Sequence, residues 1–282
     1  MNNQTTLNSK SLAQQLSQGT VLAPFVYDGL QAKLAQKIGY DAIYMTGFGA
    51  SARLGLPDVG LTTFTEMLDN ARTIASTVDI PLICDADTGY GNALNVHRTV
   101  REYENAGVAA MHLEDQQWPK RCGYMEGKSV IPAGEMQQKL RAAVDARRGD
   151  MIIIGRTDAL QSDGWNEAED RARSYLEEGV DMIFVDGVGE KDVAEYARRL
   201  GDLPVLFNNV PMIHMADIEP LPFNLVLHPG SMMALMSALT GSLKELKTKG
   251  TVTLSQHPNE IFMAALDALD AEHFSGLANK YS

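Results

Sequence analysis

The fold is decided by a pattern that is clearest in the stretch Pro81-Leu82-Ile83-Cys84-Asp85-Ala86-Asp87-Thr88-Gly89. A short apolar run without polar alternation ends there in two acidic residues and a glycine. Such a run is typical of a parallel strand whose two faces are both buried. Seven more runs share this character, and they cover residues 21–27, 42–45, 109–113, 151–155, 182–185, 205–207 and 225–227.

Amphipathic segments separate these runs. They predict helices over residues 29–38, 64–75, 95–106, 134–147, 167–178, 192–200 and 231–246. Gly39, Gly107 and Gly179 follow three of them, where glycine commonly caps a helix before the next strand. Eight strands alternating with helices predict an α/β fold, a (β/α)8 TIM-type barrel, with an open doubly wound sheet as the alternative. No linker interrupts the pattern, so we expect a single barrel domain over residues 1–282.

The composition indicates an ordinary globular protein without nucleic-acid or membrane partners. Of the 282 residues, 45% are hydrophobic, and 24 Lys and Arg against 36 Asp and Glu give a formal charge of −12. An acidic surface repels phosphate backbones. No apolar stretch is long enough to span a bilayer, and residues 1–19 lack the apolar core of a signal peptide. We therefore expect a cytoplasmic protein in which Cys84 and Cys122 are free thiols.

One long irregular segment, residues 116–133, interrupts the alternation of strands and helices. Its mixture of Trp118, Lys120, Arg121, Cys122 and Tyr124 is typical of an active-site lid rather than of a passive linker. Because Lys120 and Arg121 directly precede Cys122, we expect their positive charge to stabilise its thiolate. A helical extension over residues 257–282, with an apolar stretch at 261–269, is expected either to pad the barrel or to dock on another subunit.

Acidic residues follow the strands where barrel chemistry gathers, at the carboxyl ends. Asp85 and Asp87 follow one strand and Glu114 follows the next. Three carboxylates at one mouth repel one another and raise their pKa values, a conflict that a divalent cation removes. Oxygen ligands favour Mg2+, with Mn2+ as a substitute, and no histidine pair has zinc spacing. Helix capping or salt bridging is the alternative role for an individual acid.

Two further polar residues end neighbouring strands. Arg156 has the geometry to clamp a substrate carboxylate, and an ion pair with one of the acids is its alternative role. Asn208 is expected either to hydrogen-bond a carboxylate or to cap the next element.

Several segments together resemble the isocitrate lyase/phosphoenolpyruvate mutase superfamily. They extend in family order from about residue 20 to 230, and they are Tyr44-Met45-Thr46-Gly47, Leu54-Gly55-Leu56-Pro57-Asp58, Asp85-Ala86-Asp87-Thr88-Gly89-Tyr90-Gly91, His112-Leu113-Glu114-Asp115-Gln116, Lys120-Arg121-Cys122-Gly123 and Gly155-Arg156-Thr157-Asp158-Ala159. The resemblance implies a (β/α)8 barrel, Mg2+ and a small anionic carboxylate substrate. It also implies a homotetramer in which C-terminal helices are exchanged between subunits.

The resemblance assigns roles to individual positions. Asp87 corresponds to the direct metal ligand, whereas Asp58, Asp85 and Glu114 correspond to residues that hold metal-bound water. Cys122 corresponds to the cysteine that protonates the enolate released by C–C cleavage. The other implied catalytic residues are Arg156, Lys120 and Arg121. The implied substrate-binding residues are Tyr44, Thr46, Gly47, Phe48, Gly123, Tyr124, Asn208 and His228.

The motifs favour a lyase, with three departures from the family pattern. Tyr124 replaces a usual histidine, Asp186-Gly187-Val188 replaces a glutamate segment, and His228 stands where an aromatic or aliphatic residue is common. We predict an Mg2+-dependent C–C bond lyase that acts on a 2-hydroxy dicarboxylate or tricarboxylate of the methylisocitrate or 2-alkylmalate type, through an enolate-like intermediate. An oxaloacetate hydrolase or decarboxylase is the alternative. Carboxyphosphonoenolpyruvate mutase chemistry and a non-catalytic binding barrel are less favoured.

Overall fold

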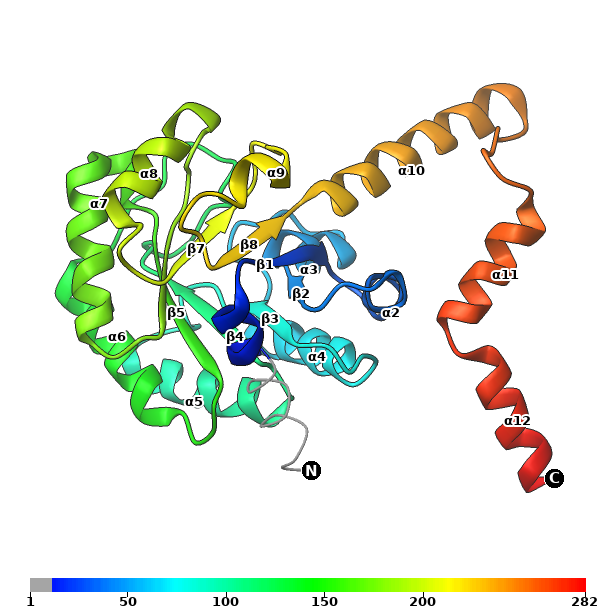
Figure 1. Ribbon diagram of the computed structural model, residues 1–282, viewed down its shortest axis with the longest axis horizontal. Coiled ribbons are helices and arrows are strands. Elements are labelled where there is room, and N and C mark those ends of the chain that lie inside the picture. The colour runs from blue at the N-terminus through cyan, green and yellow to red at the C-terminus, as the bar shows by residue number, and fades with distance from the viewer. Residues whose placement is uncertain (1–11) are drawn as a thin grey trace.

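Eight parallel strands close into a barrel in the computed structural model, which describes residues 12–282 (Figure 1). The first eleven residues, which belong to the N-terminal stretch that lacks a signal-peptide core, lie outside the described residues. The strands are β1 (Val21–Val26), β2 (Ile43–Met45), β3 (Leu82–Asp85), β4 (Ala110–Glu114), β5 (Ile152–Thr157), β6 (Met182–Val185), β7 (Val205–Asn208) and β8 (Leu225–His228). Each pairs with the next, and β1 pairs with β8. The predicted barrel is confirmed, and the open sheet is excluded.

The strand register brings the predicted polar residues to one rim. Asp85 at the end of β3 pairs with His112 of β4, and Glu114 at the end of β4 pairs with Arg156 of β5. All strands run the same way, so their carboxyl ends meet at one mouth of the barrel.

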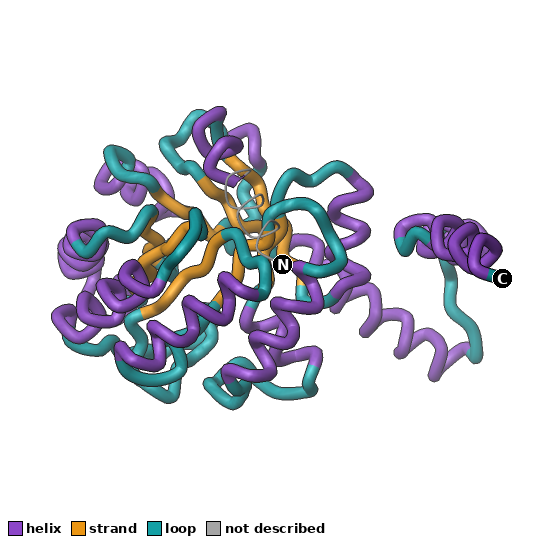
Figure 2. The backbone as a smooth tube through the Cα atoms, turned by 90° about the horizontal axis from the view of Figure 1, so that it is seen from below, coloured by secondary structure: helices purple, strands orange, loops and turns teal. Residues whose placement is uncertain are grey.

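Helices cover the outside of the strands, as Figure 2 shows from below. They are α2 (Gly29–Ile38), α3 (Gly47–Arg53), α4 (Phe64–Ala75), α5 (Ala93–Asn105), α6 (Ala133–Ala146), α7 (Ala159–Glu177), η1 (Glu190–Asp192), α8 (Val193–Leu200) and α9 (Met215–Ile218). Local sequence explains where several begin. Asp28 caps α2 by accepting from the backbone N–H of Gln31, and Thr63 with Glu66 forms a capping box at α4.

The core has an inner and an outer part. Side chains such as Phe25, Ile83, Ile154 and Phe184 pack together inside the barrel. Two further clusters lie between the strands and the covering helices. Burial on both faces accounts for the unbroken apolar character of the strands in the sequence.

The last three helices form an arm that leaves the barrel (Figures 1 and 2). This C-terminal arm consists of α10 (Gly230–Lys249), α11 (Pro258–Ala268) and α12 (Ala271–Tyr281). It starts earlier than the expected extension at residue 257, because α10 itself projects outward. Helix α11 returns toward α2, where Lys37 pairs with Asp267 at 3.0 Å. Within residues 12–282, no helix is both long and apolar enough to cross a bilayer.

Candidate active site

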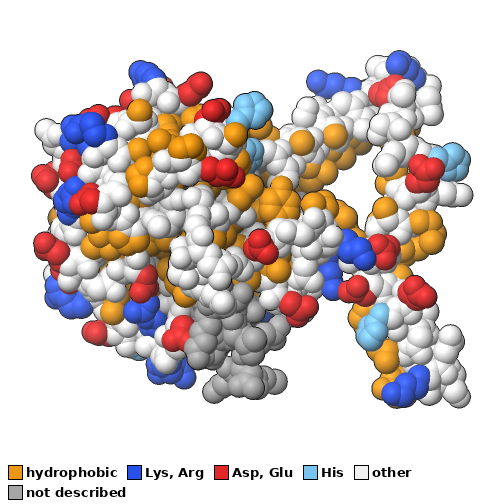
Figure 3. Space-filling model, in the orientation of Figure 1, with side chains coloured by type: hydrophobic (Ala, Val, Ile, Leu, Met, Phe, Trp, Pro, Cys, Tyr) orange, Lys and Arg blue, Asp and Glu red, His pale blue; other side chains and the backbone are white. Residues whose placement is uncertain are grey.

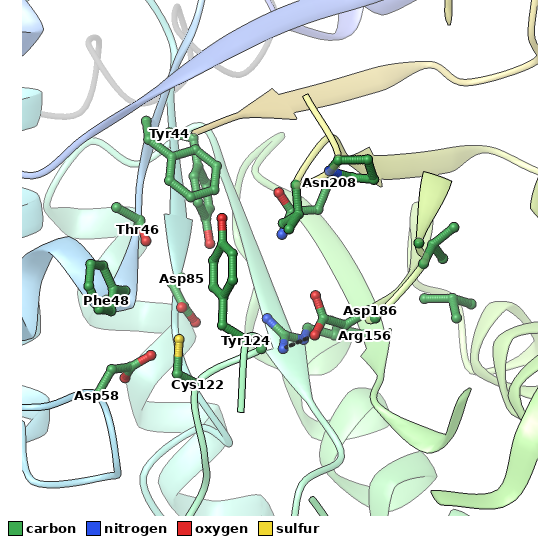
Figure 4. Close-up of a pocket in the computed structure, with 18 of the residues that line it drawn as sticks. Tyr44, Thr46, Phe48, Asp58, Asp85, Cys122, Tyr124, Arg156, Asp186 and Asn208 are labelled. Atoms are coloured by element: carbon green, nitrogen blue, oxygen red, sulfur yellow. Dashed lines mark ion pairs between the residues drawn. The ribbon is translucent and has the colours of Figure 1, made fainter. Parts of the chain in front are cut away.

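A cavity of about 420 Å³ opens at the carboxyl rim, and ten predicted site residues line it (Figure 4). They are Tyr44, Thr46, Phe48, Asp58, Asp85, Cys122, Gly123, Tyr124, Arg156 and Asn208. Four more predicted residues do not line the cavity, but each contacts a residue that does: Gly47, Asp87, Glu114 and Lys120. The sequence motifs therefore converge on one place.

Asp85 is held at the end of β3 by backbone donors. Its Oδ1 accepts from the N–H of Asp87 at 2.9 Å, and its Oδ2 accepts from the N–H of Gly47 at 3.2 Å. A Cβ added at Gly47 would lie 2.4 Å from that Oδ2. Glycine is thus required here because the carboxylate approaches the backbone directly.

Lys120 lies among the acidic residues. Its ammonium contacts Asp58 and lies 2.7 Å from Oδ1 of Asp87, and all three side chains are buried. Burial raises the pKa of Asp87 to about 6, against the opposing effect of Lys120. Burial also raises the pKa of Glu114 well above its usual range. One lysine therefore does not balance the cluster, and its carboxyls still favour an added cation.

The buried oxygens fit a hydrated cation. Oε1 of Glu114 is buried and has no hydrogen-bond partner among the described residues. In the same part of the chain, no three acidic, histidine or cysteine side chains are arranged to coordinate one ion by themselves. Mg2+ commonly keeps several waters and takes only one or two protein carboxylates. Asp58, Asp85, Asp87 and Glu114, which we call the acidic cluster, fit that mode of binding.

Arg156 joins three carboxylates from three strand ends. Its Nε and Nη2 donate to Asp158 at 2.8 and 2.9 Å, Nη2 lies 3.1 Å from Asp186, and Nε lies 3.3 Å from Glu114. The guanidinium also stacks over Phe184, 5.0 Å from the ring centroid. Among the described residues the side-chain hydrogen bonds of Arg156 use Nε and Nη2, and the residue lines the cavity.

The lid segment, residues 116–133, lies against the mouth and buries Cys122. Burial together with the negative charge of Asp58 raises the pKa of Cys122 to about 11. The expected thiolate is therefore wrong, because desolvation and Asp58 outweigh Lys120. Arg121 adds little, since its side chain is exposed and donates to the carbonyl of Glu126 at 3.3 Å.

Sequence reasoning missed Lys128, which anchors the lid. Its buried Nζ donates to Asp158 and Asp186, each at 2.8 Å. Burial opposes ionisation of Asp186, but Arg156 and Lys128 outweigh it and hold the pKa of Asp186 well below its usual range. The sequence did hold a signal for it, because Asp158 and Asp186 follow β5 and β6. Two buried carboxylates need a second cation besides Arg156.

The remaining predicted residues differ in how they face the cavity. Tyr44 OH lies 2.8 Å from Nε2 of the fully buried His112. Asn208 presents a buried Oδ1 without a hydrogen-bond partner among the described residues. Tyr124 is half exposed above the cavity. His228 is outside the lining, and its Nδ1 accepts from the N–H of Gly230 at 3.0 Å.

A closed barrel that carries buried acids, an arginine and a lid cysteine at its carboxyl rim defines an enzyme of the TIM-barrel class. The family described as phosphoenolpyruvate phosphomutase matches residues 11–247. The 2,3-dimethylmalate lyase of Eubacterium barkeri is 45% identical over 74% of this chain and 75% of its own length. The 2-methylisocitrate lyase of Aeropyrum pernix is 40% identical over 82% of this chain and 77% of its own length.

A solved structure agrees with these relatives. Oxaloacetate acetylhydrolase in complex with 3,3-difluorooxalacetate is 34% identical, has a TM-score of 0.87, and covers 96% of this chain and 98% of its own. The chain belongs to the phosphoenolpyruvate phosphomutase family, within the isocitrate lyase/PEP mutase superfamily. The predicted resemblance is confirmed, and so is the prediction of a carbon–carbon bond lyase of this superfamily.

Proposed function

We propose that the chain is an Mg2+-dependent lyase that cleaves a 2-hydroxy dicarboxylate or tricarboxylate of the 2-alkylmalate or methylisocitrate type. The observation that carries this proposal is the Cys122 thiol. Its raised pKa keeps it protonated at neutral pH, and it faces the same cavity as Arg156 and Asp85. A protonated acid beside an anion-binding site suits the capture of a carbanion-like product.

The proposed reaction breaks the bond between C2 and C3 of the substrate. Nη1 of Arg156 binds the carboxylate on C2, and the C2 hydroxyl loses its proton to a carboxylate of the acidic cluster. The electron pair of the C2–C3 bond moves to C3 and its carboxylate, while C2 becomes a ketone. Cys122 then donates its proton to C3, which gives a 2-oxo acid and a saturated carboxylate and balances all atoms.

Asp87 would hold Mg2+ directly, and Asp58, Asp85 and Glu114 would hold it through water. The ion would neutralise the acidic cluster and stabilise developing negative charge on oxygen. Mn2+ has the same preference for oxygen ligands and is proposed as a substitute. The lid segment excludes water and keeps Cys122 in place.

The proposal extends to the whole chain. We propose one barrel domain over residues 1–282 that assembles as a homotetramer with exchanged C-terminal helices, which the outward course of α10 supports. Cys84 and Cys122 are both unpaired thiols, which supports the proposed cytoplasmic location.

A substrate screen tests the proposal. We would incubate the enzyme and Mg2+ with 2,3-dimethylmalate, 2-methylisocitrate and oxaloacetate, and follow the products by NMR. Cleavage to a 2-oxo acid that EDTA abolishes is expected, and Cys122→Ser should lose it while still binding oxalate with Mg2+. Oxaloacetate turnover alone would favour a hydrolase or decarboxylase. Oxalate binding without any turnover would favour a binding protein.

A further inference from the structure

The side of the cavity away from Asp58 and Cys122 carries a group of apolar side chains beside its polar ones. Figure 4 shows Asp58, Asp85 and Cys122 on one side and Asp186 and Asn208 on the other. The loops after β6 and β7 lie next to each other at the rim because the two strands pair. These loops contribute Val188, Val210 and Pro211 to the lining. We call these three residues the apolar wall.

Cations that a second or third substrate carboxylate would need are scarce. Among the described residues that line the cavity, Arg156 is the only cation, and three carboxylates already engage its Nε and Nη2. Lys120 and Lys128 lie nearby, but each is bound to two carboxylates.

Two acidic residues line the cavity near the apolar wall, and one of them, Asp186, is paired with Arg156 and Lys128. Asp186 and Glu190, from the end of β6 and the segment that follows it, line the cavity together with Val188. Asn208, on the β7 side, is a neutral amide. A carboxylate placed against the wall would therefore lose hydration next to apolar carbon and Glu190, while Arg156 and Lys128 are already paired with carboxylates.

We propose that the apolar wall receives the C3 substituent of the substrate and selects an alkyl group over a carboxymethyl group. This inference rests on the proposed function, because it assigns the substrate's ends to the two sides of the same cavity. It narrows the substrate class to alkyl-substituted malates and disfavours tricarboxylates. Val188, Val210 and Pro211 are then specificity-determining residues.

Two substrates form a matched pair for the test. 2,3-Dimethylmalate carries a methyl group on C3 where 2-methylisocitrate carries a carboxymethyl group, and both release pyruvate. The two substituents differ by a carboxylate, and placing an unpaired carboxylate in an apolar pocket costs more than one methylene, which is worth about 10- to 200-fold in kcat/KM. We therefore expect kcat/KM for 2,3-dimethylmalate to exceed that for 2-methylisocitrate by about 100-fold or more. Similar kcat/KM values for both substrates would overturn the inference.

A cation introduced into the wall should reverse part of this preference. Val210 is only half-buried, so Val210→Arg is expected to fold, and it should lower the preference at least about tenfold, because its charge pairs with the extra carboxylate. Val252→Arg, at a half-buried valine in the distant α10–α11 connection, is the matched control and should not change the preference. Glu190→Gln, at an exposed position, should lower the preference for 2,3-dimethylmalate several-fold. An unchanged preference in a folded Val210→Arg enzyme would contradict the inference that the apolar wall receives the C3 substituent.

A binding measurement separates this inference from the proposed function. Both compounds are titrated calorimetrically into Cys122→Ser enzyme with saturating Mg2+, where turnover does not interfere. If neither compound releases pyruvate from the wild type, the proposed function fails. The ratio of the two Kd values still tests whether the apolar wall prefers a methyl to a carboxymethyl group. A ratio of about 100 in favour of 2,3-dimethylmalate supports the inference, and a ratio near one overturns it.

Discussion

Arg156 connects the ends of β4, β5 and β6 through Glu114, Asp158 and Asp186. Arg156→Lys leaves one nitrogen where two now bind carboxylates in a fixed plane. We expect turnover to fall at least about 100-fold, and the free energy of unfolding to fall by roughly 3 kcal/mol because buried carboxylates lose their partner. Steady-state kinetics and urea unfolding measure the two effects.

Arg141→Lys is the control for this substitution. Arg141 is exposed, and its ion-pair partner among the described residues is Glu178. The control should leave turnover and the urea midpoint unchanged. An Arg156→Lys enzyme that matched the control in both measurements would contradict the importance of the carboxylate network.

His228 has a defined tautomer and a shifted titration. The N–H of Gly230 donates to its Nδ1, so the ring proton is on Nε2. Burial lowers the pKa of His228 below the ordinary 6.5. The ring therefore stays neutral at pH 7, and stability decreases as the pH falls below 6.5, because the unfolded chain takes up the proton first.

An NMR titration of the ring nitrogens tests this expectation. The signal is assigned by its loss in His228→Gln, and its midpoint should lie below pH 6.5 with an Nε2–H pattern at neutral pH. A midpoint at or above 6.5 would contradict the effect of burial on the His228 ring.

At the residue scale, the sequence predicted which residues meet but not how they pair. The acids and Arg156 follow strands, and the barrel register brings strand ends together without further information. Pairing depends on side-chain reach across the mouth, which is why Lys120 between Asp58 and Asp87 was not foreseen. The pKa of Cys122 was mispredicted for the same reason. The prediction rested on Lys120 and Arg121, its neighbours in sequence, whereas burial and Asp58 raise the pKa of the thiol in the folded chain.

Two buried lysines tie the lid to carboxylates of the barrel: Lys120 binds Asp58 and Asp87, and Lys128 binds Asp158 and Asp186. Lys128→Met would leave Asp158 and Asp186 without this partner at the lid. We expect unfolding to become easier by roughly 3 kcal/mol, as for other broken buried ion pairs. Trypsin should also cut after the exposed Arg121 faster than in the wild type, which mass spectrometry of the fragments would show.

Two comparisons make the lid prediction specific. Lys191→Met, at a position in η1 outside the lining, should leave the cleavage rate after Arg121 unchanged. Lys128→Arg should restore part of the protection, because arginine keeps the charge between the two acids. Equal cleavage in Lys128→Met and wild type would mean that other contacts hold the lid.

At the element scale, long periodic segments were predicted well and short ones were not. The structure reproduces all eight strands within a few residues and α2 with its predicted bounds. Helix α3 was missed because Gly47-Phe48-Gly49-Ala50-Ser51-Ala52 has no apolar period. Its small residues serve close packing, since a Cβ on Gly49 would lie 2.7 Å from Tyr27. The start of α7 was missed too, as Gly164 at φ 83° breaks its helical pattern.

Helix α10 of the C-terminal arm exposes a row of leucine side chains. Leu235, Leu239, Leu243 and Leu246 of α10 are between 41% and 58% exposed. Their spacing places them along one side of the helix. On the face shown in Figure 3, apolar side chains continue along the arm beyond the barrel. A row of exposed leucines on a projecting helix is typical of a subunit contact.

The proposed homotetramer can be tested through this row. Light scattering coupled to size exclusion should give the wild type about four times its 30.8 kDa chain mass. Replacing both Leu239 and Leu243 by glutamate should lower that mass, because buried charges without partners oppose association. Lys244→Glu, at the exposed neighbouring position, is the control and should keep the wild-type mass. A wild-type monomer would contradict the tetramer, whereas an unchanged mass in the double variant would place the contact elsewhere on the arm.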